Sequence, residues 1–418
     1  VLARGATARP DDFGLLMSLG ETYPINIPGR SAADRAEWFR AAVALRPRNA
    51  FAHNNLGTVL SDRADPDGAA AAFREAIRLD PTIAQPHNNL GTVMYGRKNL
   101  DGAEAEYREA VRLDPTFANP HHNLGLVLRD RKNLAGAEAE YREAIRLDPT
   151  LLPPRYNLGN LLRDRGDLDG AEAVYRAAIR LDPAFALPHN GLGNVLHDRR
   201  EYAAAEAAYR EAIRLDPMFA FPHDGLGNVL SDQGKLNAAV AAYREAIRLD
   251  PKLALPHNGL GLIHEEQGEL AEAEAAYRTA VRLDPQYPTA HTNLGNVLLK
   301  QGRQPEAVVA YRQSIRLDPT NPHAHNNLGV AHEERLELAE AEAAYRAAVR
   351  LDPRRADAHN NLGDVLRKQG RHAAAAAAYR DALVIQPALG PARDGLAYCE
   401  RVLRGEVPTA PPPRPVNR

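Results

Sequence analysis

The chain has 418 residues, of which 44% are hydrophobic and 25% are charged, proportions that are typical of a folded protein. Its formal net charge of −2 provides no overall field that would attract nucleic acid or an anionic membrane, so neither partner is expected. Cys399 is the only cysteine, which excludes a disulfide within the chain and a thiolate metal cluster and fits a cytoplasmic location.

A proline recurs every 34 residues, and this period organises most of the sequence. A fixed period of this length indicates an array of structural repeats. We number positions 1 to 34 of each repeat from Ala50, so that ten full repeats cover residues 50–389. The periodic prolines are Pro47, Pro81, Pro115, Pro149, Pro183, Pro217, Pro251, Pro285, Pro319, Pro353 and Pro387.

At the N-terminus the period is irregular. Residues 1–12 resemble the tail of a preceding repeat helix, and residues 13–49 are predicted to form a divergent repeat. The gap from Gly20 to Pro47 is 27 residues, whereas the regular gap is 24, which predicts a three-residue insertion around Pro24 to Ser31.

The repeat formed by residues 84–117 shows what each regular unit is expected to form. Leu90 and Val93 lie three residues apart on one face of a first helix, and Tyr107 lies on the buried face of a second. Pro115 ends the second helix, since the residue before a proline avoids the helical region. Each unit is therefore predicted to be a helix–turn–helix.

Two segments follow the last regular repeat. Residues 390–404 are predicted to form a capping helix, with Leu396, Cys399 and Leu403 on its buried face. Residues 405–418 are rich in proline and are expected to be disordered or extended.

The repeat resembles the tetratricopeptide (TPR) motif over roughly residues 13–404. The matching positions in one unit are Leu90, Gly91, Ala103, Tyr107, Ala110 and Pro115. The resemblance implies an all-α fold, a right-handed α-solenoid superhelix, with the first helices lining a concave groove. One departure is position 4, which is histidine in nine of the ten units instead of the frequent tryptophan. The array is similar to the superhelical TPR region of O-linked N-acetylglucosamine transferases and to bacterial multidomain TPR proteins. The small number of lysines also points to a GC-rich bacterial genome.

The sequence contains no pattern that indicates catalysis, a metal or another cofactor. The position-4 histidines are one repeat apart, which is too far for two of them to share an ion, so we expect them to pack. Glutamate–arginine pairs at i, i+4 predict a solvated outer face. These pairs are Glu104–Arg108, Glu138–Arg142, Glu172–Arg176, Glu206–Arg210, Glu274–Arg278 and Glu342–Arg346.

Asparagines recur at positions 6 and 9, which the resemblance assigns to the concave groove. An amide both donates and accepts hydrogen bonds, so a row of amides suits an extended peptide without demanding one sequence. The alternative is that asparagine is simply common in this motif. The predicted peptide-binding residues are Asn55, Asn89, Asn123, Asn157, Asn160, Asn194, Asn228, Asn293, Asn296, Asn327 and Asn361.

The fifth to seventh repeats differ from the others. Large apolar residues occupy position 2 and glycines occupy position 6, which predicts a shallow apolar trough, with duplication drift as the alternative. The trough residues are Leu187, Phe221, Leu255, Gly191, Gly225 and Gly259. Position 12 is also arginine in early repeats (Arg129) and glutamate in later ones (Glu265), which predicts a preferred ligand orientation.

Three functions are compatible with this pattern. The leading hypothesis is a non-catalytic scaffold that binds an extended peptide or a partner protein in the groove. A second is a structural protein that associates head to tail into filaments. A third is the interaction region of a larger kinase or glycosyltransferase, whose catalytic residues would lie outside residues 1–418.

Overall fold

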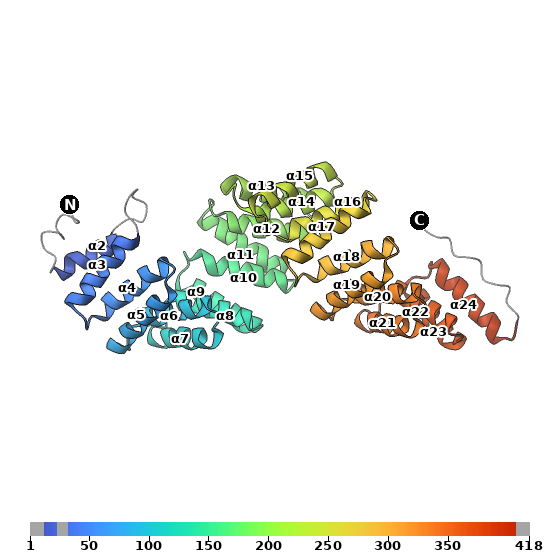
Figure 1. Cartoon of the computed structure of the whole chain (residues 1–418), viewed down its shortest axis with the longest axis horizontal. Helices are drawn as coiled ribbons and strands as arrows, with labels where there is room; N and C mark the ends of the chain where they lie inside the picture. Colours follow the sequence, from blue (N-terminus) through green and yellow to red (C-terminus); the bar gives the residue numbers. More distant parts are fainter. Residues whose placement is uncertain (1–11, 23–31, 407–418) are drawn as a thin grey trace. The chain divides into compact units, whose positions relative to one another are not determined.

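The computed structural model describes residues 12–22 and 32–406, and all regular secondary structure in them is α-helical (Figure 1). The predicted all-α solenoid of paired helices is therefore confirmed. The chain forms two compact units, residues 1–200 and residues 201–418, which are described separately. Among the described helices, none has the length and apolar character needed to cross a membrane.

The first unit begins with the helix pair α2 (Phe13–Thr22) and α3 (Ala32–Leu45). Its later first helices are α4 (Ala50–Asp62), α6 (Ala84–Gly96), α8 (Ala118–Asp130), α10 (Leu152–Asp164) and α12 (Ala186–Asp198). Its later second helices are α5 (Pro66–Leu79), α7 (Leu100–Leu113), α9 (Leu134–Leu147) and α11 (Leu168–Leu181).

The second unit begins with α13 (Tyr202–Leu215), the second helix of the fifth repeat. Its first helices are α14 (Ala220–Asp232), α16 (Leu255–Glu266), α18 (Pro288–Lys300), α20 (Pro322–Glu334) and α22 (Ala356–Lys368). Its second helices are α15 (Leu236–Leu249), α17 (Leu270–Leu283), α19 (Gln304–Leu317), α21 (Leu338–Leu351) and α23 (His372–Ile385), and α24 (Gly390–Leu403) is the last helix that the structure describes.

Three of the predicted segments lie outside the described residues. These are the helix tail in residues 1–11, the insertion around Pro24 to Ser31 and the proline-rich tail from residue 407 onward.

An aromatic ring at position 24 fills the space between the two helices of each repeat. Tyr107, for example, is 2% exposed and lies against Gly91 of α6. A methyl group added at that glycine would lie 2.7 Å from the ring, closer than van der Waals contact allows. At nine position-8 glycines, an added methyl group would lie 2.5 to 2.7 Å from the nearest atom of the position-24 ring. In these repeats the ring and the glycine therefore fit as a pair.

The turn inside each repeat uses a left-handed residue at position 15. Glycine adopts this conformation without strain, as Gly268 does with φ of 78°. Five repeats use other residues there, including Lys98 with φ of 61°. Backbone bonds such as that from the amide of Asn99 to the carbonyl of Met94 (3.0 Å) close the turn.

Contacts between repeats define two layers of helices. Within each unit, first helices contact the first helix of a neighbouring repeat, as α14 contacts α16 and α20 contacts α22. In the described parts of both units, second helices pack on the following first helix and stand further from one another.

The capping helix α24 differs from the prediction at one residue. Cys399 is fully buried and Leu396 packs against the core of the last repeat, together with Ala392. Leu403 was predicted to be buried but is 54% exposed. It occupies position 14 of the repeat register, where the other first helices end in an exposed turn, so the prediction for Leu403 was wrong.

We predict that Gly91→Leu lowers the free energy of unfolding by at least about 2 kcal/mol, because the new side chain overlaps the Tyr107 ring. Gly96→Leu in the same helix is the matched control, since nothing lies within 4 Å of its added methyl group. Urea denaturation of both variants measures the difference. Equal destabilisation by the two changes would contradict the ring–glycine contact as the constraint.

Candidate functional site

The eleven predicted asparagines all lie half-buried on first helices, between the buried core and the open surface of the first-helix layer. Asn55, Asn89, Asn123, Asn157, Asn160 and Asn194 belong to the first unit, and Asn228, Asn293, Asn296, Asn327 and Asn361 to the second. The candidate site is therefore one surface in each unit.

The asparagines at position 6 form a ladder of hydrogen bonds between successive repeats. Asn293 Nδ2 donates to Asn258 Oδ1 at position 5 of the preceding repeat, at 3.0 Å. The rungs with the same register are Asn89 to Asn54 (3.0 Å), Asn123 to Asn88 (2.9 Å), Asn157 to His122 (2.8 Å) and Asn361 to Asn326 (3.2 Å). Burial lowers the pKa of His122 to about 4, so its neutral ring can accept the bond from Asn157.

Three further asparagines, at position 9, accept hydrogen bonds from the hydroxyl groups of buried tyrosines. Tyr175 donates to Asn160 Oδ1 at 2.6 Å, Tyr243 to Asn228 at 2.7 Å and Tyr311 to Asn296 at 2.9 Å. Two other rungs leave the common register: Asn55 donates to Glu21 and Asn327 to Asn296. These internal bonds hold the amide planes of the row in fixed orientations.

The ladder uses part of the hydrogen-bonding capacity of each amide. A primary amide has two N–H donors and an oxygen with two lone pairs. The bond to the preceding repeat takes one donor of Asn293, which leaves a second N–H and the oxygen for another group. The role of the row in binding a ligand stays a prediction, and its internal role was missed because the partners are 35 residues apart in sequence.

The position-6 glycines of the predicted trough are buried, and aromatic rings occupy the space above them. A methyl group at Gly191 would lie 2.5 Å from the Tyr175 ring, and one at Gly225 would lie 2.5 Å from the Tyr209 ring. Gly259 is covered in the same way by Tyr243. The expectation that these glycines leave open space is therefore wrong, because the tyrosine of the preceding repeat fills it.

The apolar residues of the trough have different exposures. Phe221 is 48% exposed and Leu255 is 38% exposed, whereas Leu187 of the first unit is half-buried. Leu262 at position 9 of α16 is 47% exposed and was not predicted. In the second unit, α14 and α16 contact each other and carry these exposed apolar side chains on neighbouring helices.

Asp224 on α14 is a buried carboxyl group without a full set of partners. It is 6% exposed, its Oδ1 has no hydrogen-bond partner and its Oδ2 accepts only a long bond of 3.4 Å from Asn228. Burial raises the pKa of Asp224 to about 7. The next repeat has Gly259 at position 6, so it lacks the amide that serves the position-5 acceptor elsewhere.

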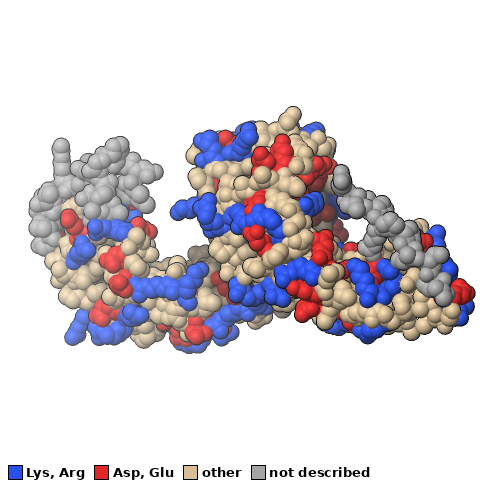
Figure 2. All heavy atoms as spheres, turned by 45° about the vertical axis from the view of Figure 1, so that its right-hand side comes forward, with Lys and Arg blue, Asp and Glu red and all other residues tan. Residues whose placement is uncertain are grey.

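The predicted change of groove charge along the chain is largely compensated. Glu265 accepts a bond from Tyr277 at 2.7 Å and pairs with Lys300 at 2.8 Å. Glu333 likewise pairs with Lys368, and in the first unit Arg129 pairs with Asp130. The expected orientation of a ligand by these charges loses its basis, because each has an opposite charge beside it. Acidic and basic groups are also intermixed on the face shown in Figure 2.

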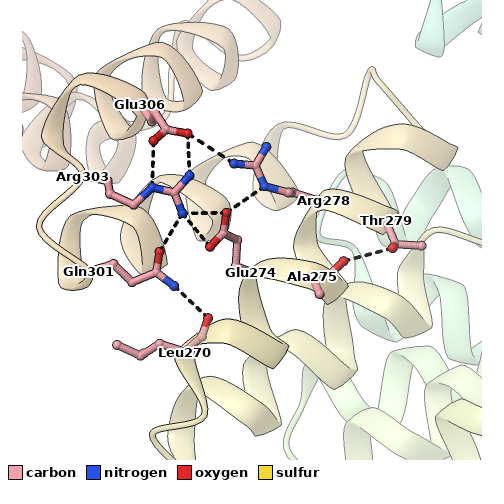
Figure 3. A network of polar contacts seen from close by, with 8 residues as sticks. All are labelled: Leu270, Glu274, Ala275, Arg278, Thr279, Gln301, Arg303 and Glu306. Carbon is pink, nitrogen blue, oxygen red and sulfur yellow. Dashed lines mark hydrogen bonds and ion pairs between the residues drawn. The ribbon is translucent and has the colours of Figure 1, made fainter.

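The glutamate–arginine pairs of the second helices are present, but the glutamates have an additional role. Glu274 pairs with Arg278 in its own helix and with Arg303 of the next repeat at 2.7 Å, and Arg303 also pairs with Glu306 (Figure 3). Glu342 pairs with Arg371 in the same register, and Glu172 with Arg199. These glutamate side chains are 16 to 19% exposed, whereas the i, i+4 arginines are 46 to 54% exposed, so the predicted solvated face also carries an ionic contact between repeats.

Several position-4 histidines form a hydrogen bond with a backbone carbonyl in the loop that precedes their repeat. The ring Nε2 of His53 lies 3.0 Å from the carbonyl oxygen of Pro47, six residues earlier, and His189 and Pro183 repeat this bond at 3.1 Å. His87 and His121 instead contact Glu106 and Glu140 through Nδ1. No cluster of three or more potential metal ligands occurs in residues 12–22 and 32–406.

Comparison with known proteins identifies the repeat type. Models described as tetratricopeptide repeat match residues 54–116, 118–151 and 190–215, and one described as TPR repeat matches residues 159–199. A model described as the C-terminal domain of cilia and flagella-associated protein 70 matches residues 223–394. These matches give no support to the bacterial origin suggested by composition. The search of curated proteins found no significant match.

Two solved structures are similar to the chain. One is the Cut9–Hcn1 hetero-tetramer of the APC/C, with 15% identity, a TM-score of 0.54, and coverage of 88% of this chain and 93% of the other. At that identity the likeness concerns the fold alone. The other is YrrB, described as a TPR protein with an unusual peptide-binding site, with 26% identity, a TM-score of 0.39, and coverage of 45% and 97%.

We predict that Asp224→Asn removes a pH-dependent loss of stability. A pKa raised from 3.8 to about 7 means that the folded state holds a proton that the unfolded state releases near pH 4. The stability from this group is therefore present below pH 4 and lost as the pH rises through 7. At about 1.4 kcal/mol per pKa unit, the variant gains at most about 4 kcal/mol at pH 8 and little at pH 4.

Denaturation by urea at pH 5 and pH 8 measures this difference. Asp232→Asn, which changes an exposed carboxylate of the same helix, is the control. A difference between wild type and Asp224→Asn that is the same at both pH values would contradict the raised pKa.

Proposed function

This chain is a tetratricopeptide repeat protein, and we propose that it binds an extended segment of a partner protein along the surface of its first helices. TPR arrays generally mediate interactions between proteins. The observation that carries the proposal is the row of half-buried amides on that surface, whose orientations are fixed by bonds between repeats.

Preorganisation is the physical reason why such a row suits a peptide. A side chain that must be ordered on binding loses conformational freedom, which weakens affinity. Asn293 is already held by Asn258 and retains an N–H donor and its oxygen. Asn361 is held by Asn326 and retains an N–H donor, while its oxygen accepts a long bond of 3.5 Å from Asn360. The spacing of these amides follows the repeats and not a particular ligand sequence, which supports recognition of backbone groups.

The proposal contains no catalytic step. The carboxylates and histidines singled out in the sequence take part in bonds within and between repeats, as Glu274 and His53 do. Their arrangement is explained by holding the array together. The proposed role is therefore that of a scaffold, with affinity and selectivity as its measurable properties.

We predict that Asn293→Ala combined with Asn361→Ala weakens binding of linear peptides about tenfold or more, since each lost hydrogen bond is worth about 1 kcal/mol. The probes are peptides selected on the wild-type chain from a displayed library of random linear sequences. Dissociation constants for wild type and variant are measured by fluorescence anisotropy, and urea denaturation verifies that the variant is folded.

Glu211→Ala combined with Glu245→Ala is the matched control, because these glutamates pair with Arg214 and Arg248 on second helices, away from the amide row. Peptides that lose affinity for the control as strongly as for the asparagine variant would contradict binding at the first-helix surface.

The match of residues 223–394 to a domain of a cilia- and flagella-associated protein supports a narrower proposal for location. We propose that the chain associates with cilia or flagella, a more specific location than the cytoplasmic one expected from the sequence. A fluorescent fusion of the chain in ciliated cells is predicted to be enriched along the cilium relative to the cell body. Uniform distribution, equal to that of the fluorescent protein alone, would contradict this location.

A further inference from the structure

In the described repeats, four position-5 asparagine oxygens accept a hydrogen bond from the next repeat, whereas Asp224 Oδ1 has no such donor. Asn258 and Asn326 accept from the position-6 asparagines of the next repeats, Asn293 and Asn361. The repeat after Asp224 has Gly259 at this position, and Asp224 Oδ1 has no donor. The same holds for Asn360: Gly395 occupies position 6 in the helix pair register that follows it, and the Asn360 oxygen has no hydrogen-bond partner. The missing donor thus follows from the glycine and is not a peculiarity of one side chain.

The charge of Asp224 distinguishes it from the other unpartnered oxygens. An unpaired neutral amide loses one hydrogen bond, whereas a buried carboxylate without a counter-charge loses much more free energy. The hydroxyl groups beside it provide no positive charge: burial, followed by the charge of Asp224, raises the pKa of Tyr243 and raises that of Tyr287 to about 12. By contrast, Glu265 and Glu333 have lysine partners.

Exposed apolar side chains lie on the same helix as this carboxyl group and on the next first helix. Phe221 is three residues before Asp224 on α14, so both lie on one side of the helix. Leu255 and Leu262 are exposed on α16, which contacts α14. Exposed aromatic and aliphatic surface next to a buried unpaired carboxyl group suits a ligand side chain that is cationic at its tip and planar.

We propose that Asp224 binds the guanidinium group of an arginine in the partner segment, with Phe221 and Leu255 contacting that arginine or its neighbours. The inference rests on the proposed function and gives it a point of sequence selectivity. A guanidinium group presents two parallel N–H donors that match both carboxylate oxygens, and its flat face stacks on an aromatic ring. It would supply at Asp224 Oδ1 the donor that Gly259 does not, once the buried carboxyl group turns toward the surface.

An array of synthetic peptides tests this inference. Each peptide has arginine, citrulline or glutamate at one central position and random residues on either side. Citrulline keeps the shape of arginine and removes its charge. For the full chain we expect arginine peptides to bind about tenfold more tightly than their citrulline counterparts, and Asp224→Asn to abolish that preference while leaving citrulline binding unchanged.

A further variant makes the test specific. Asp232→Asn removes an exposed charge from the same helix and is expected to keep the arginine preference. Peptides that bind wild type without preferring arginine, or a preference that survives Asp224→Asn, would overturn this inference and leave the proposed function intact. Absence of any peptide binding would overturn both.

Discussion

The contact between a second-helix tyrosine and a first-helix glycine is the constraint on which the rest of the structure depends. Tyr277 is fully buried against Gly261, and the same pair recurs along both units. A buried tyrosine hydroxyl group usually has a hydrogen-bond partner. In several repeats position 9 or position 12 of the same repeat provides it, as Asn228 does for Tyr243 and Glu265 does for Tyr277, whereas the Tyr141 hydroxyl has none. The choice of residues on the first-helix surface therefore begins in the core.

Two sets of polar bonds then join neighbouring repeats. On the first-helix surface the amide ladder connects positions 5 and 6 where position 6 is asparagine, and near the second helices half-buried glutamates such as Glu274 bind arginines of the next repeat. Both sets join only neighbouring repeats, which is the pattern expected of an array whose stability is a sum of local terms. Because the ladder orients the amides, the surface proposed for binding is ordered by bonds that also stabilise the array.

The fold could be predicted well from the sequence because the same helix-forming pattern recurs every 34 residues. The tyrosine, the glycine and the i, i+4 pairs were all visible as patterns within one repeat. The bonds between repeats were not, because they depend on which turn residue faces which helix. Glu274 and Arg303 are 29 residues apart, and position 14 or 16 supplies the cation in different repeats, as Arg199 and Arg303 illustrate. The prediction of an open trough was wrong for a similar reason, because the tyrosine ring that fills the space belongs to the preceding repeat.

Asp224 is the residue that these rules do not explain. Asparagine occupies position 5 in Asn190 and Asn258, the repeats on either side, and would fit without a charge. Buried polar groups that break a local pattern without compensation tend to mark functional sites. The carboxyl group lies on the same helix as Phe221, which is 48% exposed and whose ring lies 5.9 Å from that of Phe219. One explanation accounts for both: a ligand that supplies a positive charge and an apolar contact would stabilise each of them, and only when bound.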